Sequence, residues 1–588
     1  MTEQEYLQKI HELEKQVSRL QTEIKKNSET QYGLRWMDVP EAFEAEAENA
    51  IPTLEEVKEK AISNDDGKPT HILIEGDNFH ALTCLNYTHK GQIDVIYIDP
   101  PYNTGSDGFV YKDKRVLDKF PDGTTVPTDH PLRHSYWLSF IHKRLELAKN
   151  LLSERGVIFI SIDDNEQANL KLLCDQVFGE ENFIGKWCWY KSATPPNLSY
   201  KIRKNIEYVL CYEKSKNNTK YHGVKKESKS DDPITKPQNT IKKLEFPPFS
   251  IHFKGEDGVI KAGVYGTEKF PNKLCNDMII VNGVNTNSVS FENKFIWIQE
   301  RLEEEIKNGT RINCSKAIVL SYKKADYDPV VPSNFIDINV GVDTTENAGR
   351  EIANIIGEGM FDYPKPTSLI KYLLNFAPSS TILDFFAGSG TTMHATMQLN
   401  EEDGGHRQCI LVQQNENNIC EAVTYERNKR VMQGYTNSKK EYVPGLGNSM
   451  KYYRTAFVGE HKITDITDAD KVALTQKAGC LLSLGENTLE EIKTAKSYQI
   501  FQLRKGDKPT NDFGYTAVYF SGNLTYFADF RREIEQIQTA NPLTRIAVYV
   551  FTWGDPSVFE NEFDDLSGIT IKPIPQPILE IYQNIHQL

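Results

Sequence analysis

The stretch IDVIYIDPPYNTG, residues 93–105, decides the fold of this chain. Its first six residues are mostly apolar and end at a polar, proline-rich loop, which is typical of a strand buried in a parallel sheet. A similar run precedes it at 71–75, and another at 157–162 follows a helical pattern over 136–153 that closes at Gly156. Strands that alternate with helices predict an α/β domain in which helices cover a mostly parallel sheet.

The loop Asp99-Pro100-Pro101-Tyr102 follows this strand at the edge where open α/β sheets bind their ligands. The prolines fix φ at about −65° and donate no N–H, which leaves loop carbonyls free to accept. Asp99 and the Pro100 carbonyl can accept two hydrogen bonds from an exocyclic amine, which would turn the lone pair of its nitrogen outward. Tyr102 offers a ring face for a base turned out of a helix, worth roughly 1–3 kcal/mol. A simple turn after a strand fits the same four residues.

A second loop, AGSGTT at 387–392, lies between the predicted strand TILDFF at 381–386 and a predicted helix. Its glycines let the backbone close against a ligand and present N–H groups at the start of the helix. A G-x-G of this kind fits many nucleotide and cofactor folds. The strand predicted at 409–413 is followed by Gln414, where an acidic residue usually holds ribose hydroxyls. The chain has no G-x-x-x-x-G-K-[ST] sequence, which excludes a P-loop ATPase.

Length and composition predict a globular protein of three or four domains in 588 residues. Nine scattered cysteines without paired C-x-x-C and histidine spacing argue against a disulfide framework or a structural zinc site, and we expect no metal. No apolar run approaches the roughly 18 residues that span a bilayer. The polar start carries no export signal, which predicts a cytoplasmic protein without a membrane partner.

Charge is unevenly distributed along this chain of net charge −14. Residues 201–243 hold twelve Lys and Arg against five Asp and Glu, whereas residues 1–60 hold eight against fourteen. Phosphate contacts need a local surplus of cations, so the basic stretch indicates a nucleic-acid surface, with a solvated loop as the alternative. Residues 3–27 carry apolar positions three and four apart, which fits a short coiled coil or a surface helix.

The order of the two loops resembles the β-class amino-methyltransferases, in which the catalytic motif precedes the cofactor motif and a target-recognition domain lies between them. More closely, four stretches resemble the modification (Mod) subunits of Type III restriction-modification systems. They are YGLRWMDVPEAF at 32–43, HILIEGDNFHAL at 71–82, RLELAKNLLSERGVIFISIDDNE at 144–166 and FGEENFIGKWCW at 178–189. The likeness covers residues 30–435.

The resemblance implies a Rossmann-like methyltransferase fold with a circularly permuted motif order. The expected parts are an N-terminal helix at 1–30, the catalytic half of the methyltransferase domain at 31–190, an inserted target-recognition domain at 191–350, the cofactor-binding half at 351–435 and a C-terminal α/β domain at 436–588. The last part is the candidate for docking a partner or DNA. Its deletion is expected to spare cofactor binding.

The resemblance also assigns roles to residues. Catalysis is implied for Asp99, Pro100, Pro101 and Tyr102, and cofactor contacts for Asp99, Tyr102, Lys365, Asp384, Phe386, Gly388, Gly390, Thr391 and Gln414. Asn205 stands where the family pattern has a histidine before its Glu-Tyr pair, and Gln414 departs from the ribose-binding pattern. Within the basic stretch, DNA phosphate contacts are expected from Lys201, Lys204, Lys225 and Lys226.

The implied activity is direct methyl transfer from S-adenosyl-L-methionine to the N6 amine of adenine in a specific sequence of double-stranded DNA. Asp99 at the first position of its motif favours adenine. Cytosine-N4 methylation is the alternative within the enzymes, and a catalytically silent DNA-recognition subunit is the alternative outside them. The likeness to Mod subunits also implies a homodimer able to recruit an ATP-dependent restriction (Res) subunit.

Overall fold

The computed structural model describes residues 50–104, 132–193, 201–219, 231–267, 270–324, 331–376, 379–522, 524–553 and 561–586, with Leu34, Trp36, Tyr221, Gly223 and Phe559. The chain divides into two compact units, one of residues 1–219 with 333–588 and one of residues 220–332. The helix expected at 1–30 lies outside the described residues, as do Lys225 and Lys226.

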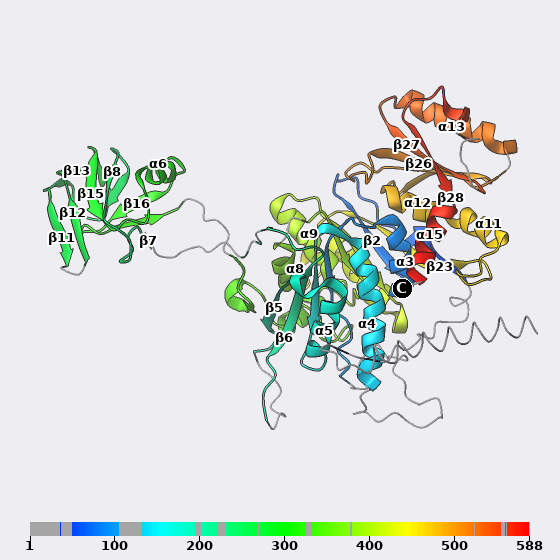
Figure 1. Cartoon of the computed structure of the whole chain (residues 1–588), viewed down its shortest axis with the longest axis horizontal. Coiled ribbons are helices and arrows are strands. Elements are labelled where there is room, and N and C mark those ends of the chain that lie inside the picture. The colour runs from blue at the N-terminus through cyan, green and yellow to red at the C-terminus, as the bar shows by residue number, and fades with distance from the viewer. Residues whose placement is uncertain are drawn as a thin grey trace, which may run out of the picture. The chain divides into compact units, whose positions relative to one another are not determined.

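A ten-stranded sheet forms the centre of the larger unit (Figure 1). Its strands, in spatial order, are β1 (Ile51–Glu56), β23 (Ser449–Val458), β2 (Thr70–Glu75), β20 (Gln408–Gln413), β19 (Thr381–Asp384), β3 (Ile93–Ile98), β4 (Leu152–Ile162), β6 (Ile206–Glu213), β5 (Phe183–Tyr190) and β18 (Phe335–Ile336). From β23 to β4 every neighbouring pair is parallel, whereas β1 and β6 run antiparallel to their neighbours. The predicted apolar runs are the central strands, as expected for a sheet covered on both faces.

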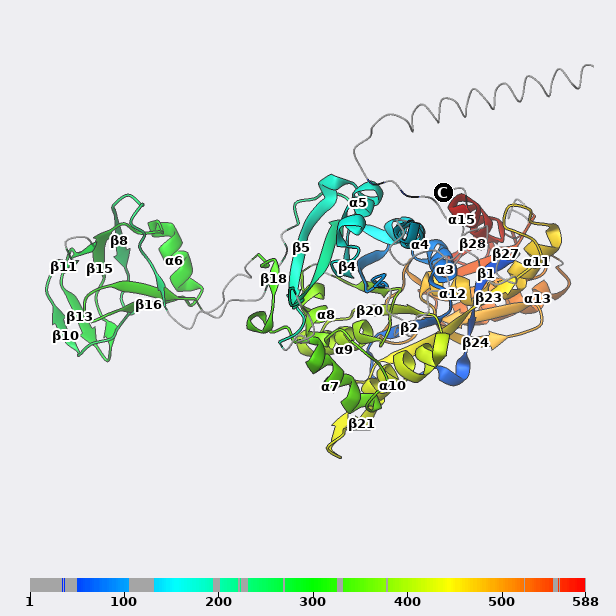
Figure 2. The ribbon, with the colours of Figure 1, turned by 90° about the horizontal axis from the view of Figure 1, so that it is seen from below.

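Figure 2 shows the sheet between two layers of helices. One layer holds α3 (Asn78–Thr88), α4 (Leu132–Leu151) and α5 (Gln167–Phe178); the other holds α7 (Thr345–Ile356), α8 (Thr367–Leu374), α9 (Thr391–Asp403) and α10 (Glu426–Gln433). Short elements connect them: η1 (Lys58–Lys60), η2 (Glu180–Asn182), η3 (Ile338–Val340), η4 (Glu416–Asn418), the π-helix η5 (Cys420–Tyr425), β21 (Gly434–Thr436) and β22 (Tyr442–Pro444). This arrangement confirms the predicted α/β class. No described helix is long and apolar enough to span a membrane.

Gly156 does not end a helix, contrary to the prediction from sequence. Helix α4 ends at Leu151 and β4 begins at Leu152, so the glycine lies inside the strand. A Cβ at Gly156 would lie 2.8 Å from the carbonyl oxygen of Ile93 on the neighbouring strand. The glycine therefore permits a close approach of two backbones where the register of the strands shifts.

The smaller unit is largely β-structure and has its own core. Its strands are β7 (Asp232–Pro233), β8 (Lys242–Phe246), β9 (Ile251–Phe253), β10 (Gly258–Ile260), β11 (Gly263–Thr267), β12 (Phe270–Leu274), β13 (Met278–Val281), β14 (Val284–Asn285), β15 (Val289–Asn293), β16 (Arg311–Cys314) and β17 (Leu320–Lys323), with helix α6 (Gln299–Lys307). Phe246, Phe291 and Phe295 pack together at its centre. The unit is shorter than the insertion expected at 191–350, because β6 and α7 belong to the larger unit.

The C-terminal part has a further five-stranded sheet, in the order β24 (Glu490–Thr494), β25 (Tyr498–Gln502), β26 (Phe513–Tyr519), β27 (Arg545–Phe551) and β28 (Ile569–Ile574). Its helical elements are α11 (Asp468–Lys477), α12 (Gly479–Glu486), η6 (Leu524–Tyr526), α13 (Phe527–Ala540), η7 (Asn561–Phe563) and α15 (Gln576–His586). This part is not separate from the main sheet, because β23 lies between β1 and β2, and α12 and α15 pack on α3. Deletion from residue 436 would remove that strand, which contradicts the expected independence of this part.

Candidate active site

The two sequence motifs meet at one edge of the main sheet. Strands β3 and β19 are parallel neighbours, with Val95 opposite Ile382 and Ile96 opposite Leu383. The loop that begins at Asp99 follows β3, and the loop at 385–390 follows β19. Two motifs far apart in sequence therefore leave adjacent strands at their carboxyl ends, the position at which α/β sheets bind ligands.

A compact group of charged and phenolic side chains occupies this edge. The Lys365 ammonium donates to Asp99 Oδ1 at 2.9 Å and Oδ2 at 2.7 Å, and to the Tyr102 hydroxyl oxygen at 3.0 Å. The Tyr102 hydroxyl donates to Asp99 Oδ1 at 2.7 Å and lies 3.2 Å from Glu207 Oε2. Glu207 Oε1 in turn accepts from Lys191 at 2.7 Å. Asp99, Tyr102 and Lys365, all predicted from sequence, thus form one hydrogen-bonded centre.

Glu207 and Lys191 are two members of this centre that the sequence did not single out. Burial opposes ionisation of the Glu207 carboxyl, but Lys365 and Lys191 outweigh it and hold its pKa below the usual value. Burial likewise works against the Lys365 ammonium, and the carboxylates of Asp99 and Glu207 reverse this and raise its pKa. The centre therefore holds a charged Glu207 carboxylate and a charged Lys365 ammonium in a largely buried place. The only signal in the sequence was the Glu-Tyr pair after Asn205.

Asp384, at the end of β19, ties the second loop to the strand. Its Oδ1 accepts from the Phe386 N–H at 3.0 Å and its Oδ2 from the Thr392 hydroxyl at 2.6 Å. Burial, with a smaller contribution from the nearby Asp99, raises the pKa of this carboxyl to about 7, against the effect of both hydrogen bonds. The Asp384 side chain therefore holds the loop conformation, and a direct cofactor contact for it stays a prediction.

The glycine loop uses several of its N–H groups within the protein. Gly388 N–H donates to Gln413 Oε1 at 2.6 Å, and Gly390 N–H donates to the Ala387 carbonyl at 2.7 Å. The N–H groups of Phe386 and Ala387 also donate within the protein. The turn thus uses four of its own N–H groups, whereas those of Ser389 and Thr391, at the start of α9, have no acceptor among the described residues.

The two glycines of this loop differ in what surrounds them. Both have positive φ, +50° at Gly388 and +72° at Gly390. A Cβ at Gly390 would lie 2.3 Å from Asn428 Nδ2, whereas a Cβ at Gly388 would meet nothing closer than the Phe361 ring at 3.4 Å. Packing inside the protein thus requires a glycine at 390, where a cofactor contact stays a prediction, and Gly388 is the position with open space beside it.

Thr391 links the glycine loop to Lys365. Its buried hydroxyl donates to the Lys365 carbonyl at 3.2 Å and accepts from Arg427 at 2.8 Å. Arg427 also donates to the Ser389 hydroxyl at 3.1 Å and pairs with Glu351 at 3.3 Å. These contacts fix the segment that carries Lys365 against the loop after β19. The arrangement gives Thr391 a role in positioning, and a direct cofactor contact for it stays a prediction.

The residues at this edge suit S-adenosyl-L-methionine, the cofactor that the resemblance implies. The cofactor is cationic at its sulfonium and amino groups, and the edge offers the carboxylates of Asp99 and Glu207 beside the Tyr102 ring. Open space remains beside Gly388, which a Cβ would occupy. Gln414 follows β20, next to β19, and its side-chain amide donates to Glu416 at 3.3 Å. The described residues therefore fit the group.

The predicted DNA contacts that the structure describes lie in the larger unit. Lys201 and Lys204 are exposed and precede β6, outside the unit of residues 220–332. Lys204 pairs with Asp164 at 3.4 Å, beyond the carboxyl end of β4. This places the Lys204 ammonium at the same sheet edge as Asp99, because β3 and β4 are parallel neighbours.

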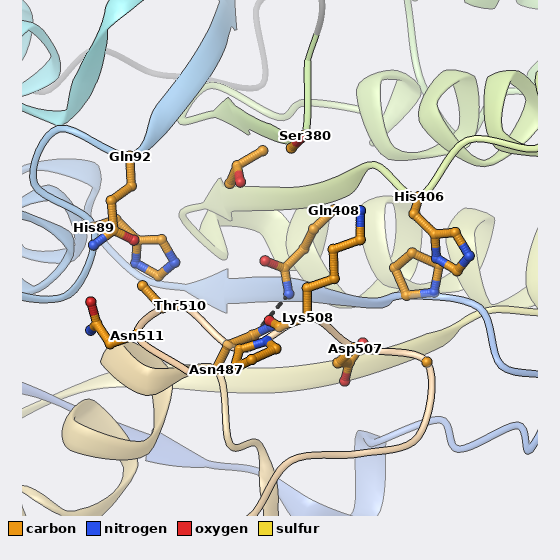
Figure 3. A pocket seen from close by; sticks show the side chains of 14 residues that line it. His89, Gln92, Ser380, His406, Gln408, Asn487, Asp507, Lys508, Thr510 and Asn511 are labelled. Carbon is orange, nitrogen blue, oxygen red and sulfur yellow. Dashed lines mark hydrogen bonds between the residues drawn. The ribbon is translucent and has the colours of Figure 1, made fainter. Parts of the chain in front are cut away.

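A separate pocket of about 360 Å³ lies at the opposite edge of the sheet (Figure 3). Thr381 and Gln408, the first residues of β19 and β20, line it together with loop residues 506–511. Its amide side chains bond within the protein: Gln408 Nε2 donates to Asn487 Oδ1 at 3.1 Å, and Asn487 Nδ2 donates to the Lys508 carbonyl at 2.7 Å. None of the predicted site residues lines this pocket.

Comparison with known proteins assigns the family. The profile of the N6_N4_Mtase family, described as DNA methylase, matches residues 93–437. The chain is 31% identical over 385 residues to the Type III restriction-modification enzyme StyLTI Mod subunit of Salmonella typhimurium. The aligned region covers 59% of this chain and 53% of that protein. It is 30% identical over 420 residues to the Type II methyltransferase M.KpnI of Klebsiella pneumoniae. Here the aligned region covers 68% of this chain and 93% of that protein.

The chain thus spans about half the length of the StyLTI Mod subunit. Among solved structures, the cytosine-N4-specific PvuII DNA methyltransferase aligns with 62% of this chain and 89% of its own, at 11% identity and a TM-score of 0.29. The matched family region contains both loops of the candidate active site and more than half of the sequence. The chain therefore belongs to the N6/N4 DNA methylase family, whose methyl donor is S-adenosyl-L-methionine.

Proposed function

We propose that the chain is a site-specific DNA adenine-N6 methyltransferase and the modification subunit of a Type III restriction-modification system. The observation that carries the proposal is the fixed position of the Asp99 carboxylate between Lys365 and Tyr102 at the carboxyl end of β3. Together with the adjacent Pro100 carbonyl, this carboxylate gives two acceptors on one stiff loop. A target amine needs that pair of acceptors if its nitrogen is to attack.

Counting acceptor sites supports this role for Asp99. A carboxylate offers about four acceptor positions. Oδ1 takes hydrogen bonds from Tyr102 and Lys365, and Oδ2 takes one from Lys365. One position on Oδ2 therefore remains for an N–H of the target amine, and Oδ2 is where the proton released on methylation can pass before it reaches water.

The cofactor supplies an electrophilic methyl group when it is bound. We assign its binding to the edge formed by Lys365, Phe386, Gly388 and Gln414, with Asp384 holding the loop in shape. Tyr102 retains the flipped base on its ring face, and its hydroxyl keeps Asp99 oriented. Positioning of this kind supplies much of the rate, because no covalent chemistry with the protein is required.

Adenine is the proposed target because the first residue of the motif is Asp99. The test incubates the protein with radiolabelled S-adenosyl-L-methionine and unmethylated DNA, followed by analysis of the digested nucleosides. N6-methyladenine is the expected product, and the Asp99→Ala protein is the control for background. N4-methylcytosine would establish the alternative base. Cofactor binding without any product would establish the silent recognition subunit instead.

We assign choice of DNA sequence to the region around the inserted unit at 220–332, between two halves of the catalytic fold whose motif order we take to be circularly permuted. Lys201 and Lys204 would contact phosphates near the flipped base. The likeness to Mod subunits supports a homodimer and an ATP-dependent Res partner. Light scattering tests the dimer, and a monomer at micromolar concentration with and without DNA would refute it.

A further inference from the structure

Trp137 of α4 holds the catalytic loop by a backbone carbonyl. Its indole Nε1–H donates to the Pro101 carbonyl at 2.6 Å, and the side chain is buried. The Pro101 carbonyl is thereby committed, although the sequence left it free to accept. Among the described residues none donates to the Pro100 carbonyl, which leaves that oxygen for the target amine.

Glu166, which follows β4, holds the same loop one residue beyond Tyr102. Its carboxylate is fully buried, and Oε1 accepts from Asn103 Nδ2 and from His134 Nδ1, each at 2.6 Å. Oε2 accepts from Asn169 Nδ2 at 2.8 Å. A buried carboxylate is costly unless donors surround it, so these three bonds define one conformation. Asn103 has a φ of +54°, a left-handed conformation that asparagine tolerates and that the bond to Glu166 fixes.

We propose that Trp137 and Glu166 are positioning residues that lock residues 101–103, so that Asp99 and the Pro100 carbonyl meet the amine together. The inference rests on the proposed function, since it explains how the loop is aimed. The lock acts on both sides of Tyr102, whose hydroxyl is 2.7 Å from Asp99 Oδ1. Release of either side lets the two acceptors drift apart, and a misplacement of about 1 Å can lower a rate about 100-fold.

The first test replaces Trp137 with Phe, which keeps an aromatic ring and removes only the donor to Pro101. The matched control is Trp187→Phe, because Trp187 is also buried, stacks on Phe376 at 5.3 Å and has an indole N–H without a partner among the described residues. Trp137→Phe is expected to lower the single-turnover methylation rate about tenfold or more with cofactor affinity within about twofold. Equal rates for the two variants would overturn the proposal.

The second test compares Glu166→Ala with Glu166→Gln. Glutamine keeps a carbonyl oxygen for Asn103, so it should restore most of the rate that alanine loses. The control is Glu486→Gln, another buried carboxylate, which accepts from Tyr549, Asn511 and Lys572; Asn511 lines the pocket at the opposite edge of the sheet. Failure of glutamine to restore the rate, with Glu486→Gln unaffected, would show that Glu166 does not act through Asn103.

A third measurement separates this inference from the proposed function. Hydrogen exchange of the Trp137 indole N–H, followed in protein with labelled tryptophan, reads the lock without any methylation. Slow exchange is expected in the wild type and faster exchange in Glu166→Ala, with the exposed indole of Trp553 as the fast reference. A wild type that methylates nothing but shows this pattern refutes the function and keeps the lock. Exchange at Trp137 as fast as at Trp553 refutes the lock.

Discussion

Replacement of Lys365 by methionine tests the charged centre directly. Methionine fills a similar length without charge, so the Asp99 and Glu207 carboxylates would lose the ammonium that they share. The Lys365 side chain is 10% exposed and that of Glu207 is 11%, while that of Asp99 is 28%. Water can therefore solvate the unpaired Asp99 carboxylate in part, but it reaches Glu207 much less. The loss of stability will come mainly from the unpaired charge of Glu207.

The size of the penalty follows from what is left unpaired. Removal of one partner of a buried ion pair costs about 3–5 kcal/mol, and Lys191 still contacts Glu207, which favours the lower end. At about 2–4 °C per kcal/mol for a large domain, the melting temperature of the larger unit should fall by roughly 6–12 °C at pH 7.5. Methyl transfer should be lost at the same time, because Asp99 is no longer held.

The pH dependence of the melting-temperature loss distinguishes an unpaired Glu207 carboxylate from a packing defect at Lys365. Lys365 and Lys191 lower the pKa of Glu207 in the folded protein, so its stabilising contribution is present above the ordinary value of 4.5 and is lost as the pH falls through the folded pKa. In the variant the buried carboxylate can take up a proton at a higher pH than in the wild type. The difference in melting temperature should therefore be largest near pH 7.5 and narrow toward pH 5.

Scanning fluorimetry of the wild type, Lys365→Met and the control Lys371→Met across this pH range provides the assay. Lys371 lies on α8 and, among the residues that the structure describes, pairs with Glu402 alone, a half-exposed partner, so its loss should cost about 1 kcal/mol or less. The double variant Lys365→Met with Glu207→Gln should regain part of the melting temperature but no activity. A temperature difference that is constant with pH, or no larger than that of the control, would refute the reasoning.

Four further changes have distinct expected outcomes. Asp99→Ala should abolish single-turnover methylation while cofactor and DNA binding persist, and near-normal turnover would contradict the mechanism. Tyr102→Phe keeps the ring face but loses the hydroxyl bond to Asp99, so the rate should fall about tenfold, with flipped-base fluorescence unchanged. Gly390→Ala should lower the melting temperature as well as cofactor affinity, because its Cβ strikes Asn428 at a φ of +72°. Lys201→Ala with Lys204→Ala should weaken binding to all DNA sequences alike and flatten its salt dependence; a changed sequence preference would mean that these lysines read bases.

The central strands could be predicted from sequence because a strand buried on both faces is a run of consecutive apolar residues. The runs at 71–75 and 93–98 correspond to β2 and β3, each within one residue of its predicted start. The two functional loops could be placed for the same reason, since a loop after a buried parallel strand lies at the carboxyl edge. The family resemblance assigned Asp99 and Lys365 to the same cofactor site, and only the structure showed that they bond to each other.

Pairings between distant strands could not be predicted. Nothing in the residues 449–458 records that they pair with β2, because a parallel ladder depends on backbone groups that every residue carries. Gly156 was misinterpreted for a similar reason: a glycine that ends a helix and one that admits a neighbouring backbone look alike in sequence. Glu207 escaped notice because its role depends on which face of β6 points to Lys365.

The position of β23 has a consequence for how the enzyme is made. Ribosomes release the chain from its amino terminus, so β2 and the loop of Asp99 emerge long before residues 449–458. Until then the edge of β2 that pairs with β23 is open, as is its other edge until β20 emerges, and an open edge is a template for association with other nascent chains. A chain terminated before residue 449 would therefore be prone to aggregation and a client of chaperones rather than a shorter folded protein.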